Sequence, residues 1–158
     1  MSVTTDITRA WRNPRAVMRG HLARDRSEPW AFALLVAFMV VAFIAQWPGA
    51  SRNSFYNPEV PMVAQLFGLA MGILVLIPVW YLLAAISHWI ARVFGGKGNH
   101  YGARLALFWA LVTVSPLMLL QGLVKGMIGP SGGLTAVSVL TGVAFVVFWM
   151  LNLIEAER

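Results

Sequence analysis

The chain has 158 residues, of which 59% are hydrophobic and 11% are charged, and it contains no cysteine. A soluble domain carries about a quarter charged residues, so this chain has too little polar surface to cover a water-soluble core. The composition predicts one membrane-embedded domain and excludes a disordered tail, a disulfide scaffold, a thiolate metal site and cysteine catalysis.

Residues 1–29 form a polar, arginine-rich arm. When positions 4–24 are projected as a helix, Trp11 lies on an apolar stripe and the arginines lie on the rest of the helix surface. Asn13 followed by Pro14 predicts a helix N-cap, and hence two short helices with a corner between them. A basic amphipathic segment suits an anionic membrane surface. We expect lipid or partner contacts from Arg9, Trp11, Arg12, Arg15 and Arg19.

A simpler interpretation of the arm is topogenic, with its arginines serving only to hold the amino-terminal segment on the cytoplasmic side. Nucleic-acid binding is not expected, because an arm tied to the bilayer lacks a recognition fold.

Four apolar stretches follow the arm. The first ends at Pro48 and Gly49, which we expect to stop its helix. The second runs from Met62 to Phe94, which is too long for one straight crossing, and we expect a bend at Pro78. The sequence therefore predicts an all-α, polytopic transmembrane helical bundle with a tail at 155–158 and four spans: 30–47, 65–86 with an extension to 94, 105–123 and 135–154.

The charges predict the orientation of the bundle. Six arginines in the arm, three positive residues between spans two and three, and Arg158 make ten of the twelve Lys and Arg, and they all fall on one side. By the positive-inside rule that side is the cytoplasm, so both chain ends are expected on the cytoplasmic side of the membrane. Four tryptophans are expected near this interface and Trp47 near the other: Trp30, Trp89, Trp109 and Trp149.

The spans offer little chemistry. None of the four span cores contains Asp, Glu, Lys or Arg, and His88 falls at the cytoplasmic edge. An ionisable residue at membrane depth is the usual mark of a functional site, and nucleophile and metal motifs are also absent from the sequence. We therefore expect no enzyme activity, no catalytic or metal site and no cofactor.

Small residues recur at four-residue spacing within the spans, which lets helix backbones approach closely. This pattern predicts either internal packing of the bundle or a contact between copies. The positions are Ala64, Gly68, Gly72, Gly122, Gly126, Ser138 and Gly142.

The loop between spans two and three carries a glycine-rich motif. Its glycines permit a tight reversal with positive φ, while its basic residues lie at the level of lipid phosphates and its tyrosine is expected at the interface. Midway along the next span a small residue precedes a proline. The proline has no N–H, so one backbone carbonyl of the preceding turn is left without its usual donor. The motif consists of Gly95, Gly96, Lys97, Gly98, Tyr101, Ser115 and Pro116, and Lys97, Tyr101 and Arg104 are candidate lipid or partner contacts.

This motif resembles the bacterial branch of the Yip family, integral membrane proteins named for their interaction with Ypt/Rab GTPases. The Asn-Pro-Arg-Ala-Val-Met run of the arm also resembles short alphaproteobacterial members. The resemblance implies an integral, oligomeric membrane protein without enzyme activity. GTPase binding belongs to the eukaryotic members.

These observations favour a membrane scaffold or adaptor that self-associates and contacts anionic lipid or a membrane protein partner at the cytoplasmic face. A small-solute channel made of several copies is an alternative, with Gln65, Gln121 and Thr113 along its path. A second alternative is an accessory subunit of a larger energy-transducing complex.

Overall fold

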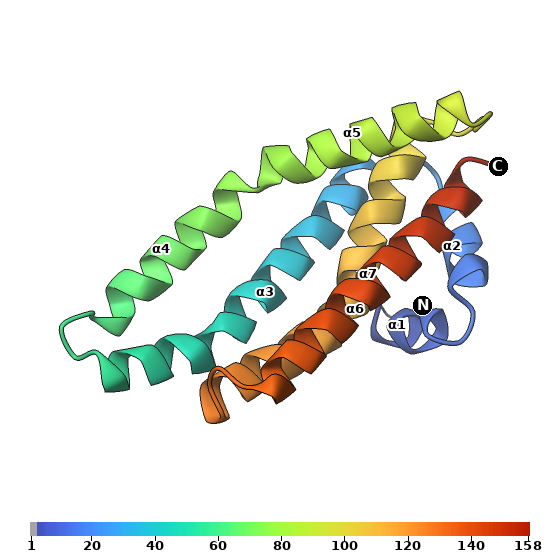
Figure 1. The fold of residues 1–158 in the computed structure, drawn as a ribbon. Coiled ribbons are helices and arrows are strands. Elements are labelled where there is room, and N and C mark those ends of the chain that lie inside the picture. Colours follow the sequence, from blue (N-terminus) through green and yellow to red (C-terminus); the bar gives the residue numbers. More distant parts are fainter. Residues whose placement is uncertain (1–2) are drawn as a thin grey trace.

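The computed structural model of the protein describes residues 3–158, which form seven α-helices (Figure 1). The first two helices are short and belong to the arm, and the other five build the bundle. The all-α prediction is therefore confirmed. In chain order the helices are α1 Val3–Ala10, α2 Pro14–Leu22, α3 Glu28–Tyr56, α4 Met62–Val75, α5 Ile77–Val93, α6 His100–Met127 and α7 Gly132–Ala156.

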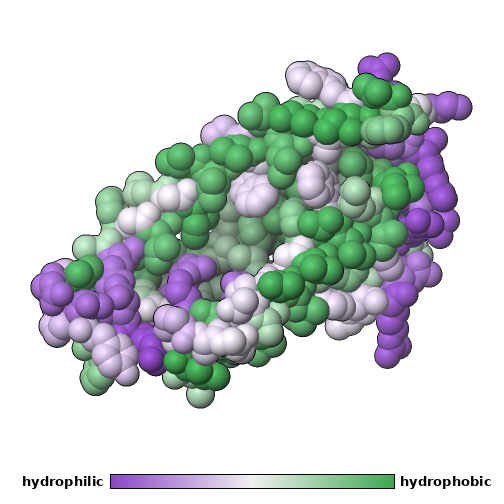
Figure 2. Space-filling model, in the orientation of Figure 1, coloured by the Kyte–Doolittle hydropathy of each residue, from purple (hydrophilic) through white to green (hydrophobic). Residues whose placement is uncertain are grey.

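Four helical segments are long and apolar enough to cross a membrane: α3, α4 together with α5, α6, and α7. Figure 2 shows apolar side chains over α4, α5 and α7, with hydrophilic residues gathered toward the two ends. The prediction of four spans is confirmed. We call the end with the α5–α6 connection the loop end. The opposite end, with the α3–α4 and α6–α7 connections, is the hairpin end (Figure 1).

The helix of the first span continues through Pro48 and ends at Tyr56, so the prediction that Pro48 and Gly49 stop it was wrong. Proline lacks the N–H that would bond one turn back, which normally weakens a helix at that point. Here α6 lies directly against this turn, because a Cβ added to Gly126 would be 2.3 Å from the Cβ of Pro48. Tertiary packing thus holds the local backbone helical.

The second span bends where it was expected to. Leu76 separates α4 from α5, and Pro78 falls in the first turn of α5. A proline at that position has no intrahelical hydrogen bond to lose. The bend is visible in Figure 1 where α4 meets α5.

The central helix of the bundle is α6. Every residue from Tyr101 to Ser115 is buried except Arg104, whereas every residue of α4 is at least partly exposed. Trp109 is fully buried, so it packs in the core and does not meet headgroups at a membrane interface as the sequence suggested.

The tightest helix contact joins α3 to α6. A Cβ on Gly122 would lie 1.9 Å from the carbonyl oxygen of Ala45, and a Cβ on Gly126 would lie 2.8 Å from the carbonyl carbon of Pro48. Both distances are far shorter than any real contact. The two backbones can meet here only because both positions are glycine.

The arm folds as two short helices joined at a corner, as the sequence predicted. The side chain of Asn13 accepts the Ala16 N–H at 3.2 Å, and Pro14 occupies the first position of α2. Both helices pack against the bundle, where Ala10 and Met18 are fully buried.

Trp11 fastens the arm to the two helices behind it. Its indole N–H donates to the carbonyl of Thr113 at 3.2 Å, and its ring meets Phe148 edge to face, with centroids 5.0 Å apart. The arm therefore closes the side of α6 that α3, α5 and α7 leave open.

Replacing Gly122 with alanine should destabilise the bundle by about 1–3 kcal/mol, because the methyl group overlaps the Ala45 carbonyl and forces α3 and α6 apart. Gly142→Ala is the matched control, since a Cβ there meets no atom within 4 Å. Unfolding in detergent measures both variants, and an equal effect would contradict the α3–α6 contact described here.

Candidate functional site

The glycine loop begins with a left-handed helix cap at the end of α5. Gly95 has φ of +91°, its N–H donates to the carbonyl of Arg92 at 3.0 Å, and the N–H of Gly96 donates to Ala91 at 2.9 Å. This pair of bonds is a Schellman motif, which favours glycine at the left-handed position. Of the three loop glycines predicted to allow positive φ, Gly95 adopts it.

The other two loop glycines make room for Glu157. A Cβ on Gly96 would lie 2.8 Å from the Glu157 carboxylate, and a Cβ on Gly98 would lie 2.4 Å from the Ala156 carbonyl oxygen. The Glu157 carboxylate accepts the N–H of Gly98 at 3.1 Å, and its backbone carbonyl accepts the N–H of Lys97 at 2.8 Å. The loop is thus a cradle for the residue that follows α7.

His88 of α5 completes this cluster. Its Nδ1 lies 2.6 Å from Oε1 of Glu157, and both side chains are buried. The His88 ring also packs against His100, the first residue of α6, with centroids 4.3 Å apart. The His88–Glu157 cluster therefore ties α5, α6 and the end of α7 together. Both carboxylate oxygens of Glu157 are already hydrogen-bonded, which makes the cluster a clamp.

The Ser115-Pro116 pair of the motif has a local explanation. Pro116 cannot donate to the carbonyl of Val112, and the hydroxyl of Ser115 donates to that carbonyl instead, at 2.7 Å. The next carbonyl along, that of Thr113, receives the indole N–H of Trp11. α6 therefore passes its proline without interruption and provides the docking point of the arm.

The residues expected to contact lipid or a partner do not all reach the surface. Tyr101 is buried, and Arg104 is paired with Glu28 in the first turn of α3. Arg15 is half-buried. Exposed side chains are left at Arg9, Trp11, Arg12, Arg19 and Lys97, of which Arg19 also pairs with Glu155 at 3.7 Å.

His21 belongs to α2 and is buried on the face of the arm that packs against the bundle. Its ring lies 4.3 Å from that of Trp109, and neither ring nitrogen has a hydrogen-bond partner among the described residues. Burial lowers the pKa of His21 below the ordinary histidine value, the positive charge of Arg24 lowers it further, and Asp6 opposes both. These shifts favour the neutral form of His21 in the docked arm.

The small-residue positions divide into two groups. Gly122 and Gly126 are used up in the contact with α3, and Ser138 accepts a hydrogen bond from Gln121 at 2.9 Å. In contrast, Ala64, Gly68 and Gly72 on α4 and Gly142 on α7 are exposed, and a Cβ on any of these three glycines would meet no atom within 4 Å.

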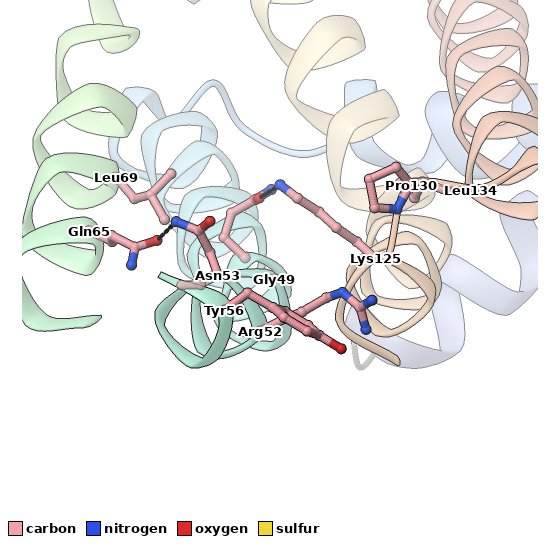
Figure 3. Close-up of a pocket in the computed structure, with 11 residues that line it drawn as sticks. Gly49, Arg52, Asn53, Tyr56, Gln65, Leu69, Lys125, Pro130 and Leu134 are labelled. Atoms are coloured by element: carbon pink, nitrogen blue, oxygen red, sulfur yellow. Dashed lines mark hydrogen bonds between the residues drawn. The ribbon is translucent and has the colours of Figure 1, made fainter. Parts of the chain in front are cut away.

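A polar cavity of about 720 Å³ opens at the hairpin end between α3, α4 and the α6–α7 turn (Figure 3). Asn53 and Gln65 are joined across it, with the Asn53 amide donating to the Gln65 carbonyl at 2.8 Å. Lys125 reaches from α6 toward α3 and donates to Gln46 at 3.2 Å. Of the proposed channel residues, Gln65 lines this cavity, whereas Gln121 and Thr113 are not among its lining residues.

Sequence reasoning missed Glu157 and His21. Nothing in the neighbouring sequence marks either position. A charged residue near a chain end and a histidine in a basic arm are both expected to be exposed to solvent. A helical projection places His21 close to the apolar stripe containing Met18, which was the available hint.

Four apolar spans and a buried central helix define a multi-pass helical membrane protein. The Yip1 domain matches residues 8–156, from α1 to the end of α7, and the chain therefore belongs to the Yip family. The match includes the arm as well as the glycine loop. No curated protein and no solved structure matches the chain.

Glu157→Ala should destabilise the protein by about 1–3 kcal/mol, because it leaves the buried His88 ring and the Gly98 N–H without their partner. Glu59→Ala is the control, since Glu59 is exposed in the α3–α4 connection. Melting temperatures in detergent compare the two. Equal losses would mean that the clamp contributes nothing.

Stability should also fall as the pH drops from about 7.5 to about 5.5, because His21 binds a proton more readily in the unfolded chain than when buried. The pKa of His21 is lower in the folded protein than in the unfolded chain. The free energy of unfolding is therefore highest above the unfolded pKa and falls as the pH drops below it. His21→Gln should flatten the dependence of the melting temperature on pH. Identical profiles for wild type and His21→Gln would refute this role.

Proposed function

We propose that this chain is a non-enzymatic scaffold or adaptor of a bacterial inner membrane that self-associates through α4. Its loop end lies in the cytoplasm and engages anionic lipid or a membrane protein partner. The observation that carries this proposal is the exposed small-residue face of α4, formed by Ala64, Gly68 and Gly72.

The α4 face suits contact with a second copy of the same chain. A lipid chain gains little from a flat glycine surface, whereas another helix backbone can approach it closely and gain van der Waals contact. The same chain provides an example, because Gly122 and Gly126 serve this purpose between α3 and α6. α4 stands at the edge of the bundle, where a partner helix has access to it (Figure 1).

The loop end supports a cytoplasmic, lipid-facing orientation. Ten of the twelve positive residues belong to the arm, to the segment from Arg92 to Arg104, or to Arg158. Each arginine close to an anionic surface contributes about 1 kcal/mol of attraction. The exposed Arg9, Arg12 and Arg19 are the residues of the arm best placed for it.

A non-enzymatic role agrees with the way polar groups are used at the loop end. The buried acid and base, Glu157 and His88, are bonded to each other and to the loop backbone. Their contacts explain why they are buried without any substrate.

Disulfide crosslinking tests self-association cleanly, because the chain has no cysteine of its own. A Gly68→Cys variant in native membranes should form a crosslinked dimer. Adding Gly72→Leu should reduce the crosslinked fraction by about tenfold, since the leucine holds the two backbones apart. Crosslinked species are separated by size on a denaturing gel.

Gly142→Cys is the matched control, because Gly142 is also exposed and free of neighbours but lies on α7. It should crosslink weakly. Dimers through Gly142→Cys and none through Gly68→Cys would refute the α4 interface. A strictly monomeric protein that captures no neighbour would refute the scaffold proposal as a whole.

A further inference from the structure

The polar cavity at the hairpin end holds two cations that lack anionic partners. Lys125 and Arg52 both line it, and none of the described residues that line it is acidic. Neither side chain forms an ion pair with any carboxylate among residues 3–158. At about 720 Å³ the cavity lies in the size range of small-molecule sites.

Both cations retain free hydrogen-bond donors. The ammonium of Lys125 has three donors and gives one to Gln46. Arg52 uses one nitrogen, Nη1, to bond the carbonyls of Gly126 and Met127 at 3.4 and 3.2 Å. Its guanidinium also lies over the ring of Tyr56, 5.0 Å from the centroid.

Two uncharged side chains of the cavity, Asn53 and Gln65, are already hydrogen-bonded. Asn53 donates to Gln65, and the Gln65 amide donates to Ser54 at 2.8 Å and to the Val60 carbonyl at 3.2 Å. The positive charges of Lys125 and Arg52 therefore favour an anionic group over a neutral polar ligand.

The backbone is shaped around these two side chains. A Cβ on Gly49 would lie 3.0 Å from the Cδ and Cε of Lys125, so the lysine stem lies flat on α3. Gly129 has φ of +80°, and a Cβ on it would lie 2.7 Å from Nε of Arg52. Two glycines on different elements thus leave the space that these two side chains occupy.

The charge distribution of the chain points in the same direction. Arg52 and Lys125 are the two positive residues that do not belong to the loop end, and both line the same cavity. A positive charge on the translocated side works against the orientation that the other ten favour. That both residues line the same cavity supplies a reason for two positive charges at the hairpin end.

From these contacts we infer that the hairpin-end cavity binds one phosphate group, either of a lipid headgroup entering from the adjoining leaflet or of a small soluble molecule. A phosphate carries up to two negative charges, which matches the two cations, and both lysine and arginine bind it well. The cavity lies at the end of α3 and α6, where phospholipid phosphates lie when these helices span a bilayer. The site does not depend on self-association through α4.

Two binding measurements distinguish the sources of the phosphate. Calorimetric titration of the detergent-solubilised protein with inorganic phosphate tests the soluble source. Native mass spectrometry of protein from nanodiscs containing phosphatidylglycerol or only phosphatidylcholine tests the lipid source. Lys125→Gln should weaken binding about tenfold in whichever measurement detects it, and Lys125→Arg should restore it within about twofold.

Lys97→Gln is the matched control for the inorganic phosphate titration, because Lys97 is the only other lysine and lies at the loop end. It should bind like the wild type. Labelling of the wild-type protein with an amine-reactive reagent adds a readout that needs no variant. Bound phosphate or phosphatidylglycerol should slow acylation of Lys125, and bound phosphate should leave that of Lys97 unchanged.

Binding by one source alone supports the site and identifies its ligand. The inference is overturned if the wild type binds neither probe, if Lys125→Gln binds as tightly as the wild type, or if neither probe protects Lys125. Crosslinking of Gly68→Cys in the Lys125→Gln background should be unchanged, so failure of this inference leaves the scaffold proposal standing.

Discussion

The backbone contact between α3 and α6 is the constraint on which the rest of the bundle depends. Within a bilayer no hydrophobic force drives helices together, so close van der Waals approach has to do so. Gly122 and Gly126 provide it against Ala45 and Pro48. This contact makes α6 the central helix, keeps α3 helical through a proline, and brings the end of α3 beside the α6–α7 turn.

Features set by local chemistry could be predicted from the sequence, and features set by distant partners could not. The Asn13 cap and the bend near Pro78 depend on neighbouring residues and were foreseen. Pro48 was misread because Gly126, the residue of α6 that packs against it, comes more than seventy residues later. The link between His88 and Glu157 spans 69 positions, and neither residue has a pattern around it that announces the other. The spacing of glycines predicted close packing but could not tell which face was already occupied.

The two ends of the molecule satisfy their polar groups in different ways. At the loop end, Glu157 is held by His88 and by the backbone of the glycine loop, so the buried charge is compensated from within. At the hairpin end, the amides pair with one another and the cations of Lys125 and Arg52 keep donors in reserve. An internally satisfied cluster gives rigidity, whereas unpaired cations beside a cavity give capacity for a ligand.

The bond between Trp11 and the Thr113 carbonyl has a consequence for the order of assembly. These groups are 102 residues apart, so the arm leaves the ribosome long before its docking site exists. The arm stays undocked, with Met18 and His21 uncovered, until the third and fourth spans have been inserted. Its docking therefore cannot precede the insertion of these spans, and a chain stalled after two spans displays an apolar surface that the finished protein conceals.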